Sequence, residues 1–402
     1  MSAHSSSPAA DQTADHFVVK AQTNPRTRSA ASLAIPMTVP EAVSTLVAEP
    51  RFKRFVRAFC GMQTEEVLHS ADHAITERDF QATIGKQLLE VILQRTAKGF
   101  KQRVDADIRQ RPACLYISNH RDIVLDTALL NHALMAHDKP VPHVAIGGNL
   151  LQTDWLVAFY RLCRAFVVRR ELTGKQLYEQ SRVVSEFVRD SIGRGEPVWL
   201  AQRPGRTKDG ADRTEPGLLR MLLLAYERAP IESCGTLNLT PVAVSYEIEP
   251  CDSFKAALLI GADTKNGSKT RARSDAAHVM RGLVQKKGRI CLTIRPPIVI
   301  DNAEDRRRGI NRADILADVA HKVDREIAAG YEIWSTNYLA HDLLHQRSDY
   351  THRYTASDRD EFNAYIDERA TEILADPAEA RNALLSLYAR PITTLSEPPP
   401  EA

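Results

Sequence analysis

Short apolar segments alternate with helical patterns through residues 106–300, and this alternation is the strongest constraint on the fold. Runs such as LYIS at 115–118 and AFVV at 165–168 are typical of buried strands, whereas the segments after them place apolar residues at helical spacing. Strands that alternate with helices pair in parallel, because each helix returns the chain to the start of the next strand. The sequence therefore predicts an α/β fold with a largely parallel central sheet flanked by helices. The predicted strands span 113–118, 143–146, 165–168, 197–201, 239–247 and 289–294.

Helical patterns also precede and follow this domain. Residues Phe80, Ile84, Leu88 and Ile92 fall on one helical face before it. After it, apolar stripes recur at helical spacing at Ile315, Val319, Val323 and Ile327, and at Phe362, Ile366 and Ile373. We expect a disordered tail at 1–38, an N-terminal helical region at 39–105, the α/β domain at 106–300, a C-terminal helical region at 301–390 and a second tail at 391–402.

The charge and cysteine content narrow the class of protein. A formal charge of +2 does not indicate nucleic-acid binding. The six cysteines form no C-x-x-C pair, which favours a reducing cytoplasm. No apolar run reaches the ~18–20 residues of a membrane span, and the polar N-terminus does not read as a secretory signal. Any membrane contact is therefore expected to be peripheral, through amphipathic helices such as 150–162 or those of the N-terminal region.

A histidine and two carboxylates lie at the junction between the predicted strand 115–118 and the helix that follows it. His120 follows the strand directly, so it should lie at the carboxyl end of the sheet, where α/β proteins bind ligands. Asp122 or Asp126 could orient the ring, leaving His120 to act as a general base. The alternative is an ordinary helix cap in which Asn119 or Asp122 accepts free backbone N–H groups.

Basic residues follow two other predicted strands. Arg169 and Arg170 come after 165–168, and Gly205, Arg206 and Lys208 come after 197–201. Arginine forks and loop N–H groups bind phosphate, so these five residues are predicted to hold a phosphorylated substrate. The alternative is that they form solvated ion pairs with neighbouring carboxylates.

Four segments in order resemble the motifs of the glycerolipid acyltransferases, the lysophosphatidate and glycerol-3-phosphate acyltransferase family. The segments are SNHRDIVLD at 118–126, GGNLLQTDWLVAFYRLCRAFVVRREL at 147–172, VWLAQRPGRTKDG at 198–210 and LTPVAVSYE at 239–247. The resemblance covers roughly residues 105–300. It implies transfer of a fatty acyl group from acyl-CoA or acyl carrier protein to a hydroxyl of a glycerophosphate or lysophospholipid acceptor. It also implies a His120 general base, no metal or further cofactor, and action at the inner face of the membrane from the cytoplasm.

Two departures from the family pattern affect this interpretation. The family spacing of His, four residues and Asp puts Leu125 in the carboxylate position, with Asp126 one residue late and Asp122 three early. Because one residue is about 100° of helical rotation, Asp126 is favoured as the smaller change, and Asp122 stays open. Pro204 stands where the family usually has Glu. This favours an alternative function, a catalytically impaired relative that binds lipid or acyl carrier protein.

The segment HDLLH at 341–345 has the helical i,i+4 spacing of a zinc-binding pair. Asp342 replaces the Glu of that motif, and no third ligand is evident from the sequence. The sequence therefore predicts packed or exposed side chains here and no metal.

Overall fold

A seven-stranded sheet forms the centre of the computed structural model, which describes residues 33–60, 64–169, 171–226, 232–265, 271–300 and 312–396. The strand order is β1-β8-β6-β2-β5-β3-β4. The strands are β1 (Ala97–Val104), β2 (Leu115–Ser118), β3 (His143–Gly147), β4 (Ala165–Val168), β5 (Val198–Ala201), β6 (Thr240–Tyr246) and β8 (Gly288–Ile294). All neighbouring strands run parallel except β6 and β8. The predicted α/β class with a largely parallel sheet is confirmed.

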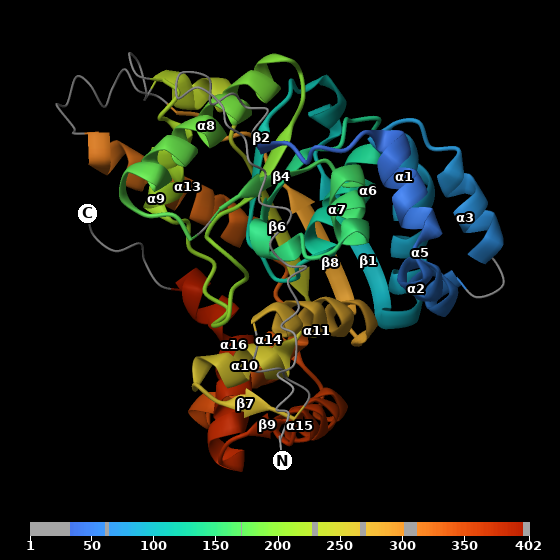
Figure 1. Cartoon of the computed structure of the whole chain (residues 1–402). Coiled ribbons are helices and arrows are strands. Elements are labelled where there is room, and N and C mark those ends of the chain that lie inside the picture. The colour runs from blue at the N-terminus through green and yellow to red at the C-terminus, as the bar shows by residue number, and fades with distance from the viewer. Residues whose placement is uncertain are drawn as a thin grey trace, which may run out of the picture.

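Helices cover both faces of the sheet (Figure 1). One face packs on α6 (Leu125–Ala136) and α7 (Asp154–Leu162), and the other on α8 (Gly174–Gly193), α9 (Pro216–Leu222) and α13 (Arg312–Gly330). Because the middle strands are buried on both sides, they read as continuous apolar runs. In β2, Tyr116 faces the first layer, while Leu115 and Ile117 face the second. Short 3-10 segments are η5 (Ala106–Gln110), η6 (Gly148–Leu150), η7 (Glu232–Leu237) and η8 (Thr351–Arg353).

The N-terminal region is helical, as far as Thr96. Its helices are α1 (Val39–Ala48), α2 (Pro50–Cys60), α3 (Thr64–Asp72), α4 (Glu77–Phe80), the π-helical turn η4 (Gln81–Gly85) and α5 (Lys86–Thr96). The predicted boundary at 105 was wrong, because 97–104 form the edge strand β1. Its exposed Lys98 and Lys101 are typical of edge strands and conceal the strand pattern.

The predicted N-terminal tail was too long. Residues 1–32 lie outside the described residues, but 33–38 pack against the domain. Leu33 and Ile35 are each 4% exposed, and Ala34 forms an antiparallel bridge to Phe166 of β4. Burial of these two apolar side chains explains why the segment is ordered despite its tail-like composition.

A C-terminal helical unit lies below the sheet in Figure 1. It contains α10 (Asp252–Leu259), α11 (Arg271–Val284), α14 (Ser335–His345), α15 (Ala356–Ala370), α16 (Pro377–Ser396) and a ladder of β7 (Asp263–Thr264) with β9 (Ile373–Leu374). Two predictions were wrong here. Ile373 lies in β9 and not in a helix, and the last helix passes 390 to Ser396, because Ala389 and Ile392 still bury side chains. None of the described helices combines the length and the apolar composition that a membrane crossing requires.

Candidate active site

His120 lies at the carboxyl end of β2, in the middle of the sheet. β2 pairs with β5 on one side and β6 on the other, so the ends of three strands meet around this turn. The backbone N–H of Thr207, in the loop after β5, donates to the carbonyl oxygen of His120 at 2.8 Å. The imidazole is 13% exposed and packs edge-on against Trp199, with ring centroids 5.5 Å apart. These contacts fix the ring at the edge of the sheet.

Asp126 holds the imidazole of His120. His120 Nδ1 lies 2.9 Å from Asp126 Oδ2, and the same oxygen accepts the backbone N–H groups of Arg121 at 2.6 Å and Asp122 at 2.9 Å. The hydroxyl of Tyr246 donates to Oδ1 at 2.8 Å. Burial opposes ionisation of Asp126, but the hydrogen bonds from His120, the backbone and Tyr246 outweigh it, so the pKa of the carboxyl is lowered. A charged Asp126 favours the tautomer with the proton on Nδ1, which leaves Nε2 as a proton acceptor.

Asp122 has a different position from Asp126. Its Oδ1 accepts the backbone N–H groups of Val124 and Leu125, both at 2.9 Å, and so caps the first turn of α6. Its Oδ2 is buried without a hydrogen-bond partner and faces Gly282 of α11, where a Cβ would lie 2.1 Å away. Burial raises the pKa of Asp122, and the charge of Asp126 raises it further. The capping interpretation therefore describes Asp122.

The additional residue between His120 and its carboxylate is accommodated in the turn. Residues 121–124 lie outside regular secondary structure, with bends at 123 and 124, and α6 begins only at Leu125. Leu125 itself, in the position that the family spacing reserves for Asp, is 1% exposed and packs in the core. Asp126 thus reaches the ring because the helix starts one residue before it.

The loop after β5 brings Gly205, Arg206 and Lys208 to the same edge of the sheet. Gly205 has φ +77°, a left-handed conformation that glycine adopts without strain. Arg206 donates to His278 Nδ1 at 2.9 Å, and a second guanidinium nitrogen, Nη1, is buried without a partner. Burial, Arg206 and other nearby cations lower the pKa of His278 to about 3, so this histidine is a neutral acceptor. Lys208 is exposed.

Arg169 lies apart from these residues. It is exposed and follows β4, the edge strand, which is separated from β2 by β5 and β3. Three strand steps of about 4.8 Å place the end of β4 roughly 14 Å from the end of β2. Arg170 lies outside the described residues. The structure therefore brings the loop after β5 to His120, and leaves Arg169 at the far edge.

A buried charge network, which we did not predict from the sequence, anchors the turn that carries His120. Arg121 is 1% exposed, and it donates to Glu249 at 3.1 Å and forms an ion pair with Asp212. Lys255 donates to the carbonyl oxygen of Arg121 at 2.7 Å and also pairs with Glu249. The guanidinium lies 5.2 Å from the centroid of the Tyr331 ring. Burial of these two cations against two carboxylates fixes the backbone next to His120.

A family model described as Acyltransferase matches residues 100–244. The match runs from β1 to β6 and includes His120, Asp126 and the loop after β5. Residues 100–244 are therefore similar to an acyltransferase domain.

The individual relatives are named as glycerolipid acyltransferases, so the predicted resemblance to that family is confirmed. A glycerol-3-phosphate acyltransferase of Xylella fastidiosa (strain 9a5c) is 25% identical over 230 residues, 56% of this chain and 24% of the relative. A dihydroxyacetone phosphate acyltransferase of Bos taurus is 25% identical over 210 residues, 52% of this chain and 29% of the relative. The chain thus spans less than a third of the length of these two relatives. A solved 1-acyl-sn-glycerophosphate (LPA) acyltransferase from Thermotoga maritima is 10% identical, with a TM-score of 0.33 over 71% of this chain and 94% of that chain.

Proposed function

We propose that the protein is an O-acyltransferase that moves a fatty acyl group from acyl-CoA or acyl carrier protein to a hydroxyl of a glycerophosphate or lysophospholipid acceptor. The observation that carries the proposal is the hydrogen bond of 2.9 Å between His120 Nδ1 and the buried Asp126 carboxylate. A histidine oriented in this way is suited to act as a general base.

The proposed reaction needs no acyl-enzyme. His120 Nε2 removes the proton of the acceptor hydroxyl as the hydroxyl oxygen attacks the thioester carbonyl carbon. The tetrahedral intermediate then breaks its carbon–sulfur bond, the ester remains, and the leaving thiolate takes the proton from the imidazolium. Asp126 stabilises that imidazolium through the hydrogen bond to Nδ1.

Arg206 and Lys208 are the proposed phosphate ligands of the acceptor. The buried, unpartnered nitrogen of Arg206 supports this assignment, because a guanidinium offers charge-assisted hydrogen bonds to phosphate oxygens. Gly205 gives the loop its left-handed turn. Arg169 and Arg170 were also predicted to bind substrate, but the distance of β4 from β2 makes Arg169 the weaker candidate.

A panel of acceptors tests the function. Thiol release would be followed from acyl-CoA and from acyl carrier protein, with glycerol 3-phosphate, dihydroxyacetone phosphate and lysophosphatidate as acceptors. Release that requires both a donor and one acceptor supports the proposal. Release that is independent of every acceptor indicates a thioesterase. No release with any pair, together with retained binding of lipid or acyl carrier protein, supports the alternative of a catalytically impaired relative, which Pro204 favours.

Pro204→Glu should raise the catalytic efficiency toward a glycerophosphate acceptor by about tenfold, because a hydrogen bond to a charged group is worth roughly 1.5–3 kcal/mol. Pro204 is exposed and immediately precedes Gly205, so a longer side chain fits without repacking. The KM for the thioester should stay constant. Pro204→Gln is the matched control, with the same length and no charge. Equal kinetics of the Glu variant and the wild type would mean that Pro204 is part of the functional site and that this loop does not correspond to the family motif that carries Glu.

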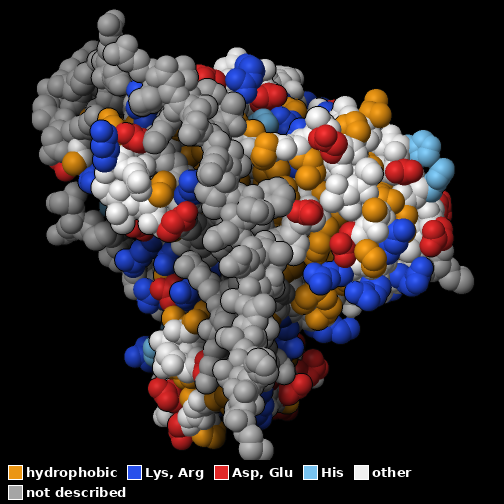
Figure 2. All heavy atoms as spheres, viewed as in Figure 1, with side chains coloured by type: hydrophobic (Ala, Val, Ile, Leu, Met, Phe, Trp, Pro, Cys, Tyr) orange, Lys and Arg blue, Asp and Glu red, His pale blue; other side chains and the backbone are white. Residues whose placement is uncertain are grey.

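Peripheral membrane contact is proposed to use the basic face of α2. Arg51, Lys53, Arg54 and Arg57 are exposed, whereas the aromatic residues Phe52 and Phe59 of the same helix are buried. Figure 2 shows Lys and Arg side chains gathered along the lower edge of the right-hand part of the molecule, over α2 and β1. This face suits anionic headgroups at the inner surface of a cytoplasmic membrane, the proposed location.

Lys53→Glu/Arg54→Glu should weaken binding to vesicles that contain anionic lipid by at least about thirtyfold. Each basic residue near the surface contributes roughly 1 kcal/mol, and the two new carboxylates add repulsion. Binding of the wild type should fall as salt rises. Lys175→Glu, an exposed lysine on α8, is the control and should bind like the wild type. Equal losses in both variants would exclude α2 as the contact face.

A further inference from the structure

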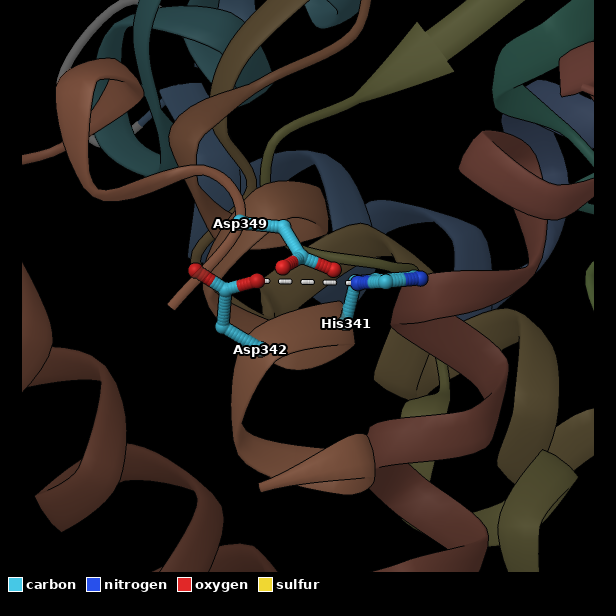
Figure 3. A group of neighbouring side chains, drawn as sticks. All are labelled: His341, Asp342 and Asp349. Carbon is cyan, nitrogen blue, oxygen red and sulfur yellow. Dashed lines mark ion pairs between the residues drawn. The ribbon is translucent and has the colours of Figure 1, made fainter. Parts of the chain in front are cut away.

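The end of α14 and the turn after it bring three potential metal ligands together, far along the chain from the acyltransferase domain (Figure 3). One potential ligand atom from each of His341, Asp342 and Asp349 lies within 4.8 Å of the other two. The chain reverses at Gln346, which has φ +52°, and this turn returns Asp349 to the helix end. Asp349 is a third potential ligand, which the sequence motif at 341–345 does not include.

Two atoms of this group are buried without hydrogen-bond partners. Asp342 is 3% exposed; its Oδ2 accepts from the backbone N–H of Tyr350 at 3.0 Å and the hydroxyl of Tyr354 at 2.7 Å. Its Oδ1 has no hydrogen bond and faces His341 Nδ1, which also has none. The two atoms are 3.6 Å apart, too far for a hydrogen bond. The two tyrosine contacts fix the Asp342 carboxylate, so its Oδ1 is directed at His341 Nδ1. A buried acceptor without a donor destabilises the fold, and a bound cation would remove that cost.

We propose that His341 Nδ1, Asp342 Oδ1 and Asp349 bind one divalent cation of the zinc class. Zinc binds imidazole nitrogen and carboxylate oxygen at about 2.0–2.2 Å. Two such ligands 3.6 Å apart subtend about 120° at the ion, close to the tetrahedral angle. Asp349 has a half-exposed side chain and an ion-pair distance of 3.7 Å to the exposed Arg347, so it is free to rotate toward the ion. Water completes the coordination, and the ion joins the end of α14 to the following turn.

This ligand set differs from the helical pair of the sequence motif. The ring of His345 packs against that of His341 in a tilted arrangement, with centroids 4.6 Å apart, and His345 is not one of the three ligands. The distinction gives a direct test, because a helical zinc pair requires His345 and the proposed site does not.

Zinc titration of the full-length, chelator-treated protein tests the site. The exposed pair His69 and His73 also has i,i+4 spacing, so all titrations use a His69→Gln/His73→Gln background. In this background, calorimetry should find one Zn²⁺ per chain with a Kd on the order of micromolar, and zinc should raise Tm. Asp349→Asn should weaken binding at least tenfold and abolish the shift in Tm. Asp349 is the test position because it is exposed and its loss spares the buried contacts of Asp342.

Two controls share the chemistry of the ligands. Asp360→Asn, an exposed carboxylate on α15, and His345→Gln should both bind zinc like the background protein. The proposal is overturned if the background protein binds no zinc, if Asp349→Asn binds as tightly as the background, or if His345→Gln loses binding.

Discussion

His120→Ala should reduce thiol release by about 10²- to 10⁴-fold, because it removes the proposed general base. The fold should survive the change. The side chain of His120 contacts Trp199 and Asp126 at the edge of the sheet, and Asp126 keeps its hydrogen bonds from two backbone N–H groups and from Tyr246. Thiol release would be measured with a saturating acceptor, and thermal unfolding would be followed by circular dichroism.

A second partly buried histidine provides the control for this variant. His143 is the first residue of β3, so it lies at the amino ends of the strands, whereas His120 lies at their carboxyl ends. The ring of His143 contacts Arg164 and Glu196. His143→Gln should therefore retain thiol release. Unchanged turnover in a folded His120→Ala protein would exclude the proposed acyl transfer mechanism.

Asp126→Asn should lower the rate by up to about 10⁴-fold, since an amide no longer fixes the tautomer of the histidine or stabilises the imidazolium. Asp122→Asn should have a much smaller effect on the rate, because an amide oxygen can still cap α6. Thiol release and unfolding would be measured for both variants. A larger rate loss in Asp122→Asn would make Asp122 the partner of His120.

Asp126 and Asp122 should contribute to the pH dependence of folding stability in opposite directions. The pKa of Asp126 is lowered in the fold, so its charge stabilises the folded state at neutral pH, and this contribution is lost as pH falls through the folded pKa. The pKa of Asp122 is raised, so its charge destabilises the fold at neutral pH, and acidification relieves that cost. Asp122→Asn should accordingly lose more stability on acidification than the wild type, whereas Asp126→Asn should lose less, and acid unfolding of the two variants would show the difference.

Local pattern was sufficient to predict most of the sheet. The six predicted strands are present because buried parallel strands are continuous apolar runs, a signal that needs no knowledge of their neighbours. β1 was missed because its outward residues are charged. The placement of β8 between β1 and β6 was not predicted. The parallel pairing with β1 joins residues about 190 positions apart, the antiparallel pairing with β6 joins residues about 50 apart, and neither leaves a local trace in the sequence.

The site was predicted to a similar extent. The position of His120 after a strand came from the local pattern, and the preference for Asp126 over Asp122 came from comparison with the spacing of the resembled family. The structure places Asp126 Oδ2 at 2.9 Å from His120 Nδ1. Tyr246 and Glu249 were not predicted, because each reaches the turn from more than a hundred residues away. An arginine that is fully buried, such as Arg121, has the same sequence signature as an exposed one.

The network around Arg121 has a consequence for how acyltransferase domains can be exchanged among relatives. The segment that matches the family ends at residue 244, yet both Glu249 and Lys255 lie beyond it, and the backbone N–H of Glu249 donates to the hydroxyl of Tyr388 in α16. A crossover at the end of the match would leave Arg121 charged in the interior without one of its carboxylates, at a cost of roughly 3–5 kcal/mol. It would also remove β8 from the open edge of β6. A segment that is exchanged without loss of stability must therefore be longer than the segment that matches the family model, and it must extend into α16.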